Sequence, residues 1–109
     1  VNGSAKAWVN FNGIGTVAIR DSLNVGSITD IGTGDYTVNF TTAMLDANYA
    51  VALTSGYTTN AANPSFGVAH RTGSGGNESV PTTSSFRMCI DDSSGNVVDT
   101  KYANAAIFR

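Results

Sequence analysis

The feature of this 109-residue chain that most constrains its fold is an alternation of apolar and polar residues with a period of two. In residues 36–40 the large apolar side chains fall at every second position, and residues 49–53 and 86–90 repeat this pattern. Successive side chains of a β-strand point to opposite faces, so each segment predicts a strand with one buried face. Residues 8–11 and 17–20 alternate in the same way, and weaker versions of the pattern occur at residues 23–31, 66–71 and 105–109.

Turn-forming residues separate these segments. Asn12-Gly13 predicts a turn through backbone with positive φ, and residues 32–35 and 91–96 predict two further turns. Residues 42–48 have room for one helical turn, and residues 56–65 and 72–85 are predicted to be long loops. We therefore expect one all-β domain over residues 1–109: a small sandwich, jelly-roll-like or knob-like, of about eight short antiparallel strands.

Composition excludes several classes of protein. Charged residues make up 13% of the chain, and the 6 basic and 8 acidic residues include no basic run, so we expect no nucleic-acid partner. No apolar stretch approaches the ~20 residues of a membrane-spanning helix, which argues against membrane insertion. A single cysteine cannot form an internal disulfide framework.

The residues capable of chemistry do not form a recognisable catalytic motif. His70 is the only histidine, Glu78 is the only glutamate, and no Gly-x-Ser-x-Gly elbow is present. Residues 91–96 resemble a calcium loop, but Tyr102 occupies the position where such a loop has its glutamate. Cys89 alternates with apolar neighbours and is expected to be a buried or half-buried small residue and not a nucleophile. We predict no enzyme activity, cofactor or metal, with a metal on a threefold axis through His70 as the open alternative.

The two long loops and their flanks contain the candidate binding residues. An aromatic ring with neighbouring amides and hydroxyls suits a polysaccharide or protein receptor, because rings stack on sugar faces and amides pair with hydroxyls. The prediction covers Tyr57, Asn60, Asn63, His70, Arg71, Asn77 and Glu78.

The first half of the chain resembles a C-terminal module of bacteriophage tail fibres and related virion appendage proteins. The motifs that carry this resemblance are KAWVNFNG at 6–13, SITD at 27–30, GDYTVNF at 34–40 and DANY at 46–49. The last six residues resemble the end of such proteins, whereas residues 54–85 do not share the likeness. The resemblance implies a β-rich, trimeric distal domain that contributes to host attachment, and it transfers no binding-residue motif.

Three functions from different classes are consistent with these observations. The first is a non-enzymatic, homotrimeric receptor-binding tip on a phage virion, the C-terminal end of a longer fibre. Its partners would be a host surface polysaccharide or outer-membrane protein and other virion tail proteins. The second is a purely structural virion module, such as a trimerisation knob, fibre cap or capsid decoration. The third is a carbohydrate-binding module.

Trp8 and Phe11 lie on opposite faces of one predicted strand, because they are separated by an odd number of positions. If one ring packs in the core, the other must contact a loop, a neighbouring subunit or water. We expect part of this additional apolar surface to lie between subunits.

Overall fold

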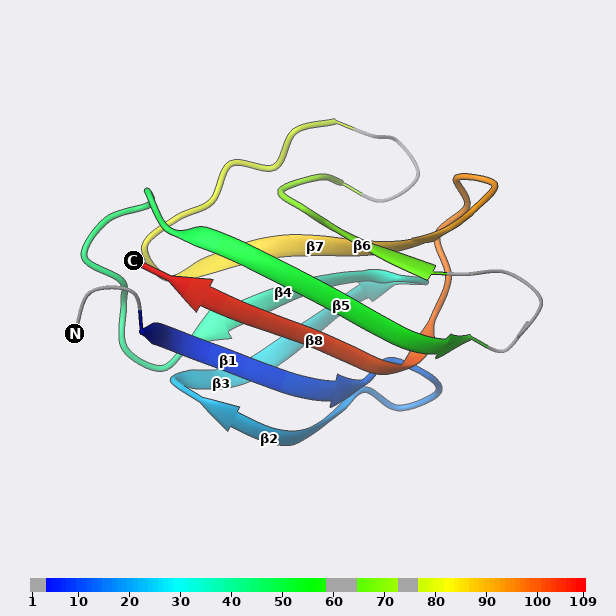
Figure 1. Ribbon diagram of the computed structural model, residues 1–109, viewed down its shortest axis with the longest axis horizontal. Helices are drawn as coiled ribbons and strands as arrows, with labels where there is room; N and C mark the ends of the chain where they lie inside the picture. The colour runs from blue at the N-terminus through cyan, green and yellow to red at the C-terminus, as the bar shows by residue number, and fades with distance from the viewer. Residues whose placement is uncertain (1–3, 59–64, 73–76) are drawn as a thin grey trace.

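The computed structural model describes residues 4–58, 65–72 and 77–109, with backbone alone at residues 57 and 58. This part of the chain forms two four-stranded antiparallel sheets that pack face to face, as Figure 1 shows. The predicted all-β sandwich of eight strands is confirmed. The strands are β1 (Ala5–Asn12), β2 (Ala18–Leu23), β3 (Val25–Gly32), β4 (Asp35–Phe40), β5 (Ala50–Thr58), β6 (Ser65–Ala69), β7 (Ser85–Asp92) and β8 (Thr100–Phe108).

The strand order gives each sheet two edges. Sheet A has the order β2-β1-β8-β5 and sheet B the order β3-β4-β7-β6. In Figure 1 sheet A lies in front, so its outer face is turned to the viewer. On one side of the sandwich the chain crosses from sheet A to sheet B at Asn24, which joins β2 to β3 and has a φ of 56°. On the other side β5 contacts β6, where Gly67 leaves so little room that an added Cβ would lie 2.5 Å from the Cβ of Leu53.

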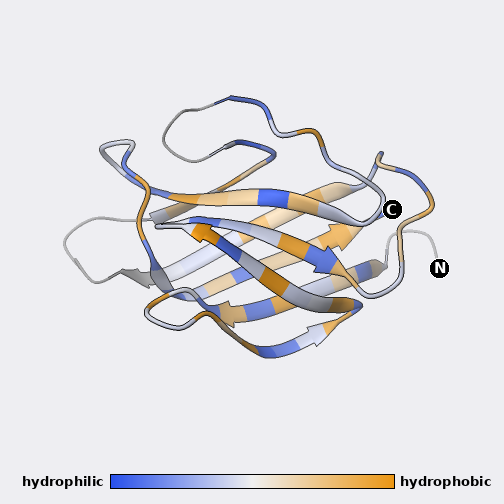
Figure 2. Ribbon diagram, turned by 180° about the vertical axis from the view of Figure 1, so that it is seen from behind, coloured by the Kyte–Doolittle hydropathy of each residue, from blue (hydrophilic) through white to orange (hydrophobic). Residues whose placement is uncertain are grey.

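The core consists of the side chains that the alternation predicts to point inward. In β1 they are Ala7, Val9 and Phe11, each at most 1% exposed, and Figure 2 shows the corresponding bands of hydropathy along the strands. Phe11 of sheet A and Tyr36 of sheet B meet edge to face, with ring centroids 5.1 Å apart. Such pairs contribute about 0.5–1.5 kcal/mol beyond the area they bury, so this contact stabilises the packing of the two sheets.

Three turn predictions have different outcomes. The 32–35 hairpin is confirmed by the antiparallel pairing of β3 with β4, and the 91–96 turn by the return of the chain after β7. The break at Asn12-Gly13 is confirmed, because β1 ends at Asn12 and β2 begins at Ala18, but the residue of that loop with positive φ is Gly15, at 69°. Residues 42–48 form bends and not a helical turn.

Candidate functional site

Four of the predicted binding residues are brought together in one hairpin, here called the 70–79 hairpin. It begins at His70, whose φ of 61° turns the chain back. Strand β6 therefore ends at Ala69, two residues before the end of the predicted strand at residue 71. Its two described limbs pair through an Arg71–Glu78 bridge, and the amide of Thr72 donates to the carbonyl of Asn77 at 2.8 Å. His70, Arg71, Asn77 and Glu78 are therefore neighbours.

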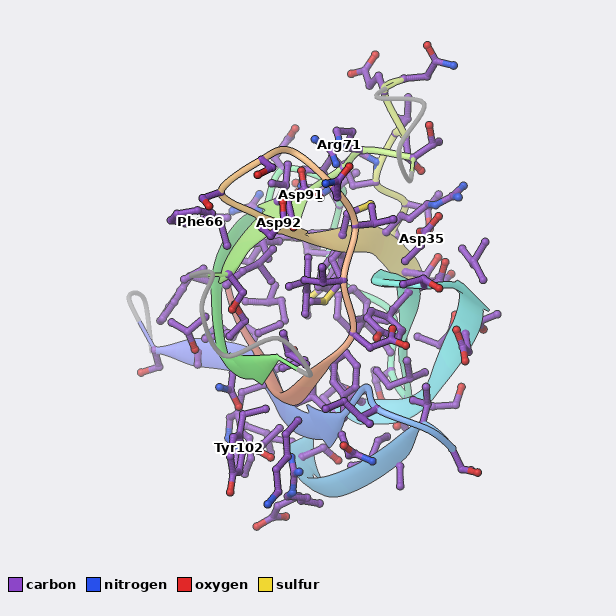
Figure 3. The ribbon with its side chains drawn as sticks, turned by 90° about the vertical axis from the view of Figure 1, so that its right-hand side faces the viewer. Asp35, Phe66, Arg71, Asp91, Asp92 and Tyr102 are labelled. Atoms are coloured by element: carbon purple, nitrogen blue, oxygen red, sulfur yellow. The ribbon has the colours of Figure 1, made fainter. Side chains whose placement is uncertain are left out.

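The base of the hairpin is fixed to the outer face of sheet B. The Arg71 guanidinium makes an ion pair with Asp91 of β7, with an N–O distance of 2.6 Å, and Figure 3 shows the two side chains together. Cys89 donates from Sγ to the carbonyl of Arg71 at 3.1 Å, so the hairpin backbone lies over this thiol. The hydrogen bond that Arg71 donates to Asp91 raises the pKa of Arg71. A charge paired in this way anchors the hairpin firmly.

His70 points from the hairpin toward the core. Its ring packs against Phe86 and Tyr49, with centroid distances of 6.0 and 6.4 Å. Its Nδ1 atom is buried and has no hydrogen-bond partner among the described residues. Burial lowers the pKa of His70, and the nearby Glu78 opposes this shift only in part. The imidazole is thus a neutral packing group at pH 7.

This packing makes stability depend on pH. The unfolded chain takes up a proton at His70 near the ordinary pKa of about 6.5, whereas the folded chain does so only at lower pH. The contribution of His70 is therefore complete above pH ~6.5 and is lost as pH falls. We expect urea unfolding to show a larger loss of stability between about pH 7 and pH 5.5 for the wild type than for His70→Asn, a residue that tolerates positive φ. Equal losses in both proteins would contradict this assignment.

The other predicted binding residues have a different status. Asn77 and Glu78 are exposed on the second limb of the hairpin. The backbone of Tyr57 lies near the end of β5, one residue before Thr58, which pairs with Thr100. The side chain of Tyr57 lies outside the described residues, as do Asn60 and Asn63 entirely.

A second surface, which the loop-based prediction did not include, lies on the outer face of sheet A. Trp8 is half-buried there, on the face opposite the fully buried Phe11, as the parity of the two positions predicts. Together with side chains of β5 and β8 it lines an open hollow of about 370 Å³. The alternation in residues 8–11 and 104–107 indicates which side chains of these two segments point to the outer face. Only the pairing of β1 with β8 brings the two segments together.

The buried carboxylate of Asp35 and the buried thiol of Cys89 are engaged in internal contacts. Asp35 accepts two hydrogen bonds from the Arg87 guanidinium, at 2.8 and 2.6 Å. Burial raises the pKa of the Cys89 thiol, so it stays protonated at neutral pH, where it is a poor nucleophile. Among the described residues no group of three or more His, Cys, Asp or Glu side chains is arranged to hold a metal ion.

No protein-family model matches the chain, and it matches neither a curated protein nor a solved structure. In the described part of the chain, no helix has the length and apolar character needed to cross a membrane.

Proposed function

We propose that this domain is the distal tip of a phage tail fibre and attaches the virion to its host through non-covalent contacts. The observation that carries the proposal is the 70–79 hairpin, an exposed recognition segment on a fixed base. The Arg71–Asp91 ion pair and the Cys89 hydrogen bond hold its first limb, while Asn77 and Glu78 face solvent. Binding residues are commonly found on loops that a rigid scaffold positions.

The distribution of the tail-fibre resemblance supports the same proposal. Its motifs fall largely on the scaffold. Residues 6–13 coincide almost completely with β1, residues 27–30 lie within β3, and residues 34–40 coincide almost completely with β4. The hairpin belongs to the 54–85 region, which does not share the resemblance. A common scaffold with distinctive loops suits a family of attachment proteins that recognise different receptors.

Homotrimer formation is part of this proposal. Several large apolar side chains are exposed on the single chain, among them Leu45 at 84% and Val80 at 71%. A small domain gains stability when such surface is buried between subunits. Further partners would be other tail proteins and a host polysaccharide or outer-membrane protein, and the place of action would be the virion. A purely structural virion module is the competing function.

Cell binding tests the role of the hairpin. Fluorescently labelled chain, shown by sedimentation velocity to be folded and in a defined oligomeric state, is titrated onto host cells and measured by flow cytometry. We expect saturable binding, with about tenfold weaker half-saturation for the double variant Asn77→Ala/Glu78→Ala, because interface side chains at the centre of a contact commonly contribute more than 1 kcal/mol.

The matched control is Ser93→Ala/Ser94→Ala, which changes two exposed side chains in the turn after β7. This variant is expected to bind within twofold of the wild type. Equal binding by the hairpin variant would remove the hairpin from the binding site. A folded wild-type chain that does not bind the cells would favour the structural module.

A further inference from the structure

We propose that the hollow around Trp8 on the outer face of sheet A binds a neutral saccharide. This inference deepens the proposed function, on which it rests, by naming a ligand class and a second contact surface. The hollow is separate from the 70–79 hairpin. Figure 3 shows Tyr102, which belongs to the outer face of sheet A, on the opposite side of the sandwich from Arg71 and Asp91.

The register of sheet A explains why a hollow forms beside the indole. Trp8 of β1 lies opposite Ala106 of β8, which in turn lies opposite Ala52 of β5. Across the sheet, the large indole of Trp8 is thus followed by the small methyl side chains of Ala106 and Ala52. The resulting hollow has a volume of about 370 Å³, at the lower end of the range for ligand pockets.

The next row of the sheet supplies polar groups. Asn10 lies opposite Asn104, and Asn104 lies opposite Thr54. The Asn104 amide donates from Nδ2 to Thr54 Oγ1 at 3.1 Å, and this bond orients the amide. Directly opposed side chains have Cβ atoms about 4.5–5.5 Å apart, a spacing that lets neighbouring hydroxyls of one sugar ring contact both amides.

Arg20, on the edge strand β2, holds the side-chain amide of Asn10 in place. Its NH1 donates to Asn10 Oδ1 at 3.0 Å and its NH2 to the carbonyl of Lys101 at 2.6 Å. Its Cζ lies 4.6 Å from the centroid of the Tyr102 ring. With Oδ1 held in this way, the Nδ2 hydrogens of Asn10 are the groups available to donate to a ligand, whereas Asn104 Oδ1 is available to accept.

The chemistry of this lining favours a sugar over a charged ligand or another protein. None of the residues that line the hollow carries a formal charge, and the Arg20 guanidinium at its edge is engaged by Asn10, the Lys101 carbonyl and the Tyr102 ring. An aromatic ring beside oriented amides matches a saccharide, which has apolar C–H faces and many hydroxyls. A protein surface placed on the same row would have to pair every amide or leave it unsatisfied at a cost of about 1–3 kcal/mol each.

Tryptophan fluorescence gives a direct test, because Trp8 is the only tryptophan of the chain. The full chain is titrated with neutral oligosaccharides built from glucose, galactose, mannose or N-acetylglucosamine. We expect at least one of them to change the emission saturably. Calorimetry should then show about tenfold weaker binding for Trp8→Ala and Asn104→Ala and largely retained binding for Trp8→Phe, which keeps an aromatic ring.

The hairpin variant Asn77→Ala/Glu78→Ala is the control and should bind the sugar like the wild type. The inference is overturned if no oligosaccharide changes the emission at millimolar concentration, or if binding survives Trp8→Ala. It is also overturned if Trp8→Ala dissociates an oligomer that the wild type forms, because the face would then be a subunit interface. If the chain binds host cells but no oligosaccharide changes its tryptophan emission, this inference is contradicted and the proposed function is not.

Discussion

Gly34→Ala is expected to destabilise the domain by more than about 3 kcal/mol, a large part of the 5–15 kcal/mol typical of a domain. Gly34 has a φ of 63°, a conformation that strains residues with a Cβ. A Cβ at this position would also lie 2.6 Å from the carbonyl oxygen of Val98 and 2.8 Å from that of Ile90. Both atoms belong to the backbone, so they cannot move aside as a flexible side chain can.

The matched control for this prediction is Gly15→Ala. Gly15 has a similar φ of 69°, but an added Cβ would meet nothing within 4 Å. Its substitution isolates the backbone strain, which we expect to cost about 1 kcal/mol. Urea unfolding of the two variants measures the difference, and equal destabilisation would show that the contacts around Gly34 do not restrict this turn.

Arg87→Met is expected to lower the free energy of unfolding by about 3 kcal/mol, the second largest effect. The substitution leaves the Asp35 carboxylate, whose side chain is 9% exposed, without the guanidinium that donates two hydrogen bonds to it. Removing one partner of a buried ion pair typically costs 3–5 kcal/mol, because the remaining charge stays desolvated. The value here belongs at the low end, since the Arg87 side chain is 24% exposed.

Arg109→Met provides the comparison at the surface. Arg109 makes the same two-bonded contact with Asp46, but each side chain is 36% exposed. Water screens exposed pairs, so we expect this variant to unfold close to the wild type. Adding Asp35→Asn to Arg87→Met should recover part of the lost stability in thermal or urea unfolding. A double variant no more stable than Arg87→Met alone would argue that desolvation of Asp35 is not the cause.

Much of the fold is predictable because a sandwich imposes a period of two on its strands. The burial of Phe11 and the outward position of Trp8 follow from their parity alone. So does the position of Cys89 on the outer face of sheet B, although its burial does not. That thiol is covered because the 70–79 hairpin folds back over it.

The candidate sites depend on contacts that a local pattern does not contain. Arg71 and Asp91 are 20 positions apart, and β1 and β8 are at opposite ends of the sequence. The positive φ at His70 could not be predicted from the sequence either, since histidine is not one of the residues that dominate turns. Alternation therefore identifies faces, but tertiary pairing decides which faces and side chains form a site.

Competition for phage adsorption is the decisive measurement for the proposed attachment role of this domain. Host cells are preincubated with saturating purified chain, the parent phage is added, and unadsorbed particles are counted over time. If this sandwich contacts the receptor, adsorption falls in proportion to occupancy, and the hairpin variant Asn77→Ala/Glu78→Ala competes about tenfold less well. An adsorption rate unchanged by folded wild-type chain at any concentration would contradict an attachment role.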